Sequence, residues 1–141
     1  MPVPDGNIVA YSNGGTISQM LGASLVDYTT YILSVDIGHR LDGVNGYPTD
    51  YTIALFAGNM LLNSVSGSSS PIPLGTFATQ SLSYTAGTTS PSGNLAIVLT
   101  STGIQSQFDN VQLSATPVPE PGSLALLATG LGLAFFIFRR R

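Results

Sequence analysis

The most constraining feature of this 141-residue chain is a succession of short runs rich in β-branched and aromatic residues, separated by clusters of Gly, Asn, Ser and Pro. In 31–37 and 51–57 the apolar side chains recur at every second position. A period of two places successive side chains on opposite faces of a strand, and no helical period of useful length occurs before Thr116. The pattern therefore predicts an all-β domain.

Other runs complete the predicted set of strands. The runs at 7–11, 16–21 and 95–99 predict three more strands, and the unbroken apolar run of the last is typical of a central strand covered on both sides. Gly58-Asn59 predicts a tight antiparallel hairpin, because both residues tolerate positive φ. About eight short strands favour a sandwich of two sheets over a single sheet. The polar segments 64–71 and 86–93 are predicted to be exposed loops.

Two runs change the phase of their alternation. Phe77 lies at an odd position whereas Leu82 lies at an even one, and Phe108 and Val111 show the same shift. If all these side chains face the core, each strand needs a bulge or bend between them. In the run that contains Phe108 and Val111, the predicted bulge is Asp109-Asn110, and we expect these two residues to have a structural role rather than to bind a ligand.

An uncharged segment of 17 residues, 122–138, follows near the C-terminus. As a helix it would extend about 26 Å, close to the roughly 30 Å of a hydrocarbon core. A buried core helix is the alternative, but the run is apolar on all faces. It predicts a single transmembrane helix, and the basic cluster of Arg139, Arg140 and Arg141 predicts that its end lies in the cytoplasm and the β domain outside it.

The residues before this segment give a more specific signal. Pro119, Glu120 and Pro121, followed by a Gly-containing apolar helix and the terminal arginines, resemble the PEP-CTERM sorting signal. The resemblance implies an exported protein of an exopolysaccharide-producing Gram-negative bacterium, recognised and cleaved by the membrane enzyme exosortase. The predicted divisions are a sandwich at 1–115, a Pro-rich linker at 116–121, the membrane helix at 122–138 and the arginines at 139–141.

The β domain carries a second resemblance. The stretches 14–21, 30–40 and 108–113 are similar to galactose-binding-like, jelly-roll domains that often accompany this signal. Such domains carry earlier strands before the region that begins here at Asn7. The N-terminus also lacks the basic and apolar regions of a secretory signal. We therefore expect an N-terminally truncated sandwich; a complete minimal sandwich is the alternative.

Charge and cysteine content exclude several classes of function. Residues 1–118 contain six Asp against the single Arg40, and such an acidic surface repels nucleic acid. The chain has no Cys, so disulfides and thiolate metal sites are impossible. No spacing matches a nucleophile, metal or phosphate motif, and we predict a protein that is not an enzyme.

Three sets of residues are candidates for binding. Asp36, Asp42, Asn45 and Asp50 could supply oxygen ligands to Ca²⁺, although Asx turns explain them as well. His39 beside Arg40 is interpreted as a loop hydrogen-bonding residue rather than a catalytic one. Sugar stacking would use the tyrosine rings that flank these acids, and the available ones are Tyr28, Tyr47 and Tyr51.

Three functions follow from these observations. The first is a non-enzymatic, anchored protein of the cell surface or extracellular matrix, whose partners are the bilayer and exosortase. The second is a module that binds exopolysaccharide, with or without Ca²⁺. The third is a hydrolase, which would need carboxylates or a Ser and His pair that converge in space.

Overall fold

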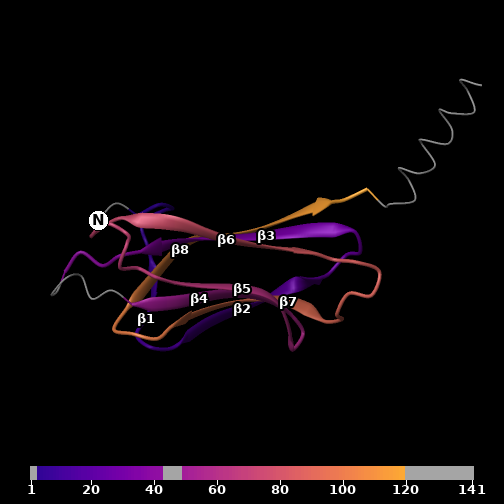
Figure 1. Ribbon diagram of the computed structural model, residues 1–141, viewed down its shortest axis with the longest axis horizontal. Coiled ribbons are helices and arrows are strands. Elements are labelled where there is room, and N and C mark those ends of the chain that lie inside the picture. The colour runs from indigo at the N-terminus through magenta and orange to yellow at the C-terminus, as the bar shows by residue number, and fades with distance from the viewer. Residues whose placement is uncertain (1–2, 43–48, 120–141) are drawn as a thin grey trace, which may run out of the picture.

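A computed structural model describes residues 3–42 and 49–119, and in this part of the chain all regular structure is β-strand (Figure 1). The eight strands are β1 (Ala10–Ser12), β2 (Thr16–Ser24), β3 (Thr29–Gly38), β4 (Asp50–Ala57), β5 (Met60–Ser68), β6 (Phe77–Thr85), β7 (Asn94–Ser101) and β8 (Ser106–Pro117). The runs that predicted strands all fall within or overlap one of them.

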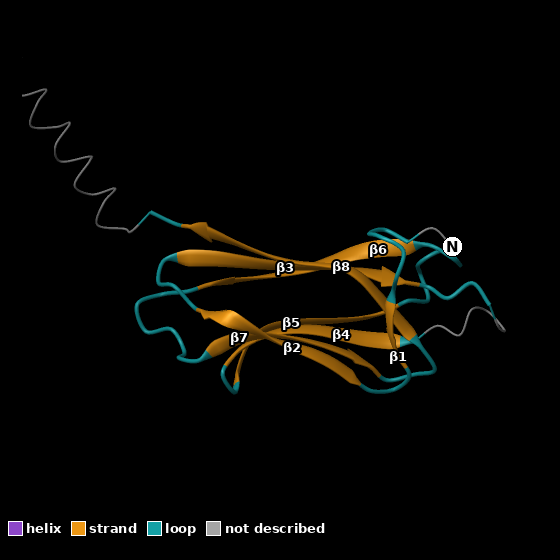
Figure 2. Cartoon of the chain, turned by 180° about the vertical axis from the view of Figure 1, so that it is seen from behind, coloured by secondary structure: helices purple, strands orange, loops and turns teal. Residues whose placement is uncertain are grey.

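The strands form two four-stranded sheets, one above the other (Figure 2). Sheet A has the order β1-β8-β3-β6 and sheet B the order β2-β7-β4-β5, and all paired neighbours are antiparallel. The predicted antiparallel β-sandwich is confirmed. Among the residues described, no helix is long and apolar enough to cross a bilayer, and the predicted span at 122–138 lies outside them.

The core lies between the two sheets. Leu33, Val35 and Ile37 of β3 face Ile53 and Leu55 of β4, and all five are fully buried. They are the odd-numbered residues of each strand, as the alternation predicts. Removing this apolar surface from water is the main stabilising contribution. The chain has no Cys, so no disulfide adds to it.

The hairpin between β4 and β5 forms as predicted. Ala57 pairs with Met60, and Gly58 has φ 54°. The predicted loop at 64–71 is wrong in its first half, because β5 continues to Ser68. The serines there belong to an edge strand with a solvated outer face, and backbone pairing with β4 stabilises them despite their polarity.

The two predicted bulges have different outcomes. In β6 the pairing with β3 is unbroken from Phe77 to Thr85, so the predicted bulge is wrong. Phe77 lies on the outer face of sheet A, where it covers Gly38. In β8 the register shifts opposite Ser34 and Asp36, and Asn110 has φ 47°, so this bulge is confirmed.

β7 is central in sheet B, between β2 and β4, as predicted. The prediction that this strand is covered on both sides is only partly correct. Leu95, Ile97 and Leu99 are buried in the core, whereas Ala96 and Val98 are half-buried on the outer face. The outer face of sheet B is therefore open to solvent even at its centre.

The sandwich has two distinct ends. At the tail-side end, the amide of Val118 donates to the carbonyl of Tyr28 (2.6 Å), and the amide of Tyr28 donates to Ala86 (2.9 Å). The β4–β5 hairpin lies at the same end, since the side chain of Asn63 donates to the carbonyl of Ser83 (2.7 Å). The opposite, far end contains the loops 39–42, 69–76 and 102–105.

Candidate functional site

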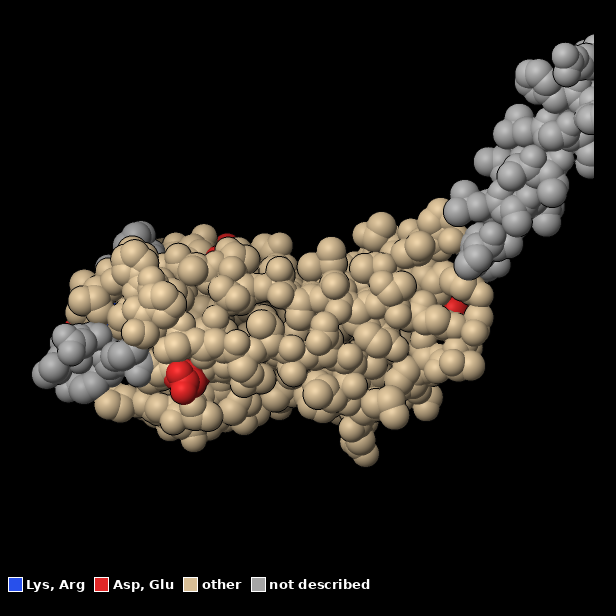
Figure 3. All heavy atoms as spheres, in the orientation of Figure 1, with Lys and Arg blue, Asp and Glu red and all other residues tan. Residues whose placement is uncertain are grey.

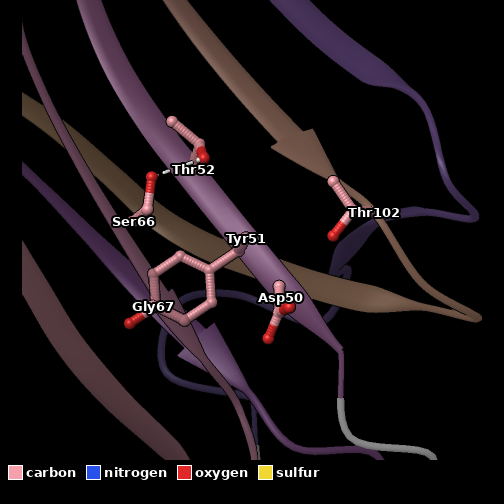
Figure 4. A pocket seen from close by; sticks show the side chains of 6 residues that line it. All are labelled: Asp50, Tyr51, Thr52, Ser66, Gly67 and Thr102. Carbon is pink, nitrogen blue, oxygen red and sulfur yellow. Dashed lines mark hydrogen bonds between the residues drawn. The ribbon is translucent and has the colours of Figure 1, made fainter.

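A polar pocket of about 320 Å³ lies where β4 begins, at the far end of sheet B. Figure 4 shows the residues that line it, which are Asp50, Tyr51, Thr52, Ser66, Gly67 and Thr102. They come from β4, β5 and the residue after β7. The amide of Thr102 donates to the carbonyl of Asp50 (3.1 Å), which holds the two segments together.

Tyr51 forms the wall of this polar pocket next to β5. Its ring lies over Gly67, where an added Cβ would come within 2.5 Å of the phenol oxygen. Burial raises the pKa of the Tyr51 phenol above its ordinary value. Only 4% of the residue is exposed, so its ring is not an open platform for a sugar.

A row of hydroxyl groups leads away from the polar pocket across the outer face of sheet B. Thr52 and Ser66 share a hydrogen bond (2.7 Å), and so do Thr16 and Thr100 (3.2 Å). Thr100 pairs with both Thr16 and Thr52, so the four residues lie side by side on four strands. Such a hydroxyl row offers donors and acceptors without charge.

The four predicted Ca²⁺ ligands are not brought together as a set. Asp36 is on sheet A, where its carboxylate accepts from Thr79 and from Asn110 (3.0 Å). Asp42 is exposed and paired with Arg40, whose hydrogen bond lowers the pKa of that carboxyl group. Asp50 lines the polar pocket, and Asn45 lies outside the described residues. In the described residues, no three acidic, His or Cys side chains are grouped as metal ligands, and Ca²⁺ binding stays a prediction.

Sequence reasoning missed a pair of buried carboxylates on the outer side of sheet A. Asp36 and Asp109 are directly opposite each other on β3 and β8. Asp109 accepts from the amide of Asp5 (3.1 Å), so the N-terminal segment lies over the pair. The phase change at Asp109-Asn110 marked one member, but only the strand pairing reveals its neighbour.

His39 has the structural role that was predicted. It is buried, and its Nδ1 lies 2.5 Å from the carbonyl of Ile72. Its backbone amide and carbonyl bond to Thr76 and Gly75, so it fixes the loop at 69–76.

The sorting segment follows the sandwich directly. β8 extends to Pro117, two residues into the predicted linker, and Val118 is still hydrogen-bonded. Pro119 is exposed. Glu120, Pro121 and the arginines Arg139, Arg140 and Arg141 lie outside the described residues.

The described residues thus define an antiparallel β-sandwich whose last strand ends at Pro117. Sequence comparison agrees: residues 1–114 match the HpiC1 cyclase family, and the chain belongs to that family. Residues 117–141 match the PEP-CTERM protein-sorting motif, which confirms that resemblance. None of the curated proteins is a significant sequence match.

Solved structures support the fold assignment. A cyclase from Fischerella sp. TAU is 29% identical with a TM-score of 0.69, and the match covers 83% of this chain and 67% of that one. A cyclase from the same organism in complex with 4-(1H-indol-3-yl)butan-2-one is 28% identical with a TM-score of 0.66, covering 83% and 68%. The chain therefore spans about two thirds of these relatives.

A structure described as CBM4 shares the fold at 15% identity, with a TM-score of 0.56 and coverage of 77% and 71%. The resemblance to carbohydrate-binding-like sandwiches is thus confirmed for the fold. Because the Fischerella proteins are described as cyclases, the prediction that this chain is not an enzyme stays a prediction.

Proposed function

We propose that this chain is an exported, non-enzymatic surface protein that is anchored by its tail and processed by exosortase. The observation that carries the proposal is the sorting motif at 117–141, which begins where the last strand of a folded sandwich ends. The apolar run would span the membrane with the arginines in the cytoplasm. The sandwich would then stand at the cell surface or in the extracellular polymer.

The motif residues have separate roles in this proposal. Pro119 and Pro121 favour an extended backbone, which suits a segment bound by a processing enzyme. Glu120 supplies the carboxylate that such an enzyme would recognise. Arg139, Arg140 and Arg141 would hold the cytoplasmic end.

The test is Glu120→Ala in an exosortase-bearing host, with the chain fused to that host's signal peptide. We expect cleavage and surface delivery to be lost. Asp27→Ala is the matched control, because it removes an exposed carboxylate just outside the motif at the tail-side end, and it should leave both unchanged. Unchanged processing of Glu120→Ala would refute the sorting role.

A second candidate function, binding of a neutral exopolysaccharide, is favoured by the polar pocket and its hydroxyl row. Asp50, Thr52 and Ser66 would hydrogen-bond sugar hydroxyls. Ca²⁺ could assist through Asp36, Asp42, Asn45 and Asp50 as predicted from the sequence.

A second hollow in the described residues is mainly apolar. An apolar hollow of about 450 Å³ opens between β2 and β8, lined by Leu21, Leu95, Ile97 and Leu113 with Gln19 and Tyr31 among its polar members. Neither a carboxylate nor an imidazole lines it in the part of the chain that the structure describes.

Isothermal titration distinguishes these functions. We expect heat with the producer's own polymer and none with 4-(1H-indol-3-yl)butan-2-one, the ligand of the Fischerella cyclase. Thr52→Val should weaken polymer binding, whereas Thr85→Val should not, because the Thr30–Thr85 hydroxyl pair (2.9 Å) lies on the other sheet. Repeating the titration with a chelator tests Ca²⁺. Heat with the indole ketone alone would favour the cyclase function.

A further inference from the structure

Few residues separate the sandwich from the predicted membrane span. The amide of Val118 still bonds to the domain, and the apolar run begins at residue 122. Three residues, 119–121, lie between them, and the four steps from residue 118 to residue 122 can extend about 14 Å at most. The polar headgroup layer is about 5 to 8 Å thick on each side of the hydrocarbon core. A sandwich tethered so closely has its tail-side end at the lipid surface.

The composition of the two ends fits this placement. Among the described residues, Asp27 is the charged side chain at the tail-side end, whereas the other charges are on the strands and loops toward the far end, namely Asp5, Asp36, Arg40, Asp42, Asp50 and Asp109. Figure 3 shows how few charged groups interrupt the surface on one face of the molecule. An end that carries a single described charge, on Asp27, enters the interface at a small cost of desolvating ions.

Exposed apolar side chains lie at the tail-side end. Val26 is 62% exposed, Met60 57% and Leu61 50%. Met60 and Leu61 begin β5 after the hairpin and border a shallow hollow with Pro91, and Val26 precedes the Tyr28 that bonds the tail. Half or more of the surface of each of these side chains is open to solvent.

We propose that the tail-side end rests on the bilayer, with Val26, Met60 and Leu61 inserted into the headgroup layer. The contact is apolar, since no Lys or Arg is described at this end to attract anionic lipid. It fixes the orientation of the sandwich, so that the polar pocket at the far end faces away from the membrane. This inference rests on the proposed anchoring by the tail.

The test uses the full chain in phosphatidylcholine vesicles. Because the chain has no Cys, single substitutions give unique labelling sites. Leu61→Cys carrying an environment-sensitive fluorophore should be quenched by brominated lipid. Leu74→Cys is the matched control, since Leu74 is 48% exposed in the far-end loop and should not be quenched. The quenching at residue 61 should persist at high salt.

The outcomes separate this inference from the anchoring proposal. Vesicle flotation reports the anchor alone, and failure to float would overturn both. Flotation with equal quenching at residues 61 and 74 would overturn only the lipid contact. Shielding of residue 61 that needs exosortase in the membrane would also overturn it, because the surface would then bind protein rather than lipid.

Discussion

At the scale of single residues, Gly67 decides the shape of the polar pocket. An added Cβ there would meet the phenol oxygen of Tyr51 at 2.5 Å and the ring carbon Cζ at 2.8 Å. Gly67→Ala should therefore lower the free energy of unfolding by about 1 to 3 kcal/mol and weaken any ligand of the pocket.

Gly22→Ala is the control for this prediction. Gly22 lies on an exposed edge strand with nothing within 4 Å of its added Cβ. That change should alter the free energy of unfolding by about 0.5 kcal/mol or less. Urea titration of both variants measures the difference, and equal effects would show that the contact with Tyr51 is unimportant.

Tyr51 also gives the chain a pH dependence. Burial raises the pKa of its phenol above that of the unfolded chain, which is about 10. The contribution to stability is fully present below that pH and is lost as pH rises through the folded pKa. Tyr51→Phe should therefore lose less stability than the parent chain between about pH 9 and pH 11. Parallel urea midpoints over this range would contradict the assignment.

At the scale of elements, the bulge in β8 depends on Asn110. Its positive φ is costly for residues other than Gly and Asn, and its side chain donates to the carboxylate of Asp36 (3.0 Å). Asn110→Ala should lower the free energy of unfolding by about 2 to 3 kcal/mol, since it loses both advantages. Asn110→Gly keeps the backbone freedom and should cost about 1 kcal/mol less. The order of the two urea midpoints checks the argument.

Strands were predictable where the alternation of apolar residues along the sequence matches the alternation of buried residues in the structure. β3 and β4 have alternating sequences because one face of each is in the core. The bulge of β8 was visible as a phase change. A similar phase change between Phe77 and Leu82 wrongly predicted a bulge in β6. Phe77 instead covers Gly38 on the outer face, and this contact depends on the pairing of β6 with β3. The second half of β5 was missed, since a solvated edge strand can be composed of serine.

At the scale of the whole molecule, the sequence predicted the sandwich and its tail but not the site. The polar pocket joins residues from β4, β5 and the end of β7, and its Gly67 lies in a segment predicted to be a loop. The predicted ligands Asp36 and Asp50 lie on different sheets, because the order of strands is set by non-local pairing. Spacing along the chain carries no information about that order.

The acidic charge of the whole domain should make its stability depend on salt. Residues 1–118 carry six Asp and one Arg, and Arg40 is paired with an exposed Asp42 in a contact of little energetic value. Repulsion among the acidic groups should therefore dominate the electrostatic free energy. Raising NaCl from about 0.02 M to about 0.3 M shortens the screening length from about 20 Å to about 6 Å.

We expect this screening to raise the free energy of unfolding by about 0.5 to 1 kcal/mol, measured by urea titration of the full chain in non-ionic detergent with a chelator present. The gain should shrink in Asp50→Asn, which removes one exposed acid from the far end. Val26→Thr changes no charge at the tail-side end and should retain the full gain. A loss of stability with salt would instead mean that favourable charge pairs outweigh the repulsion.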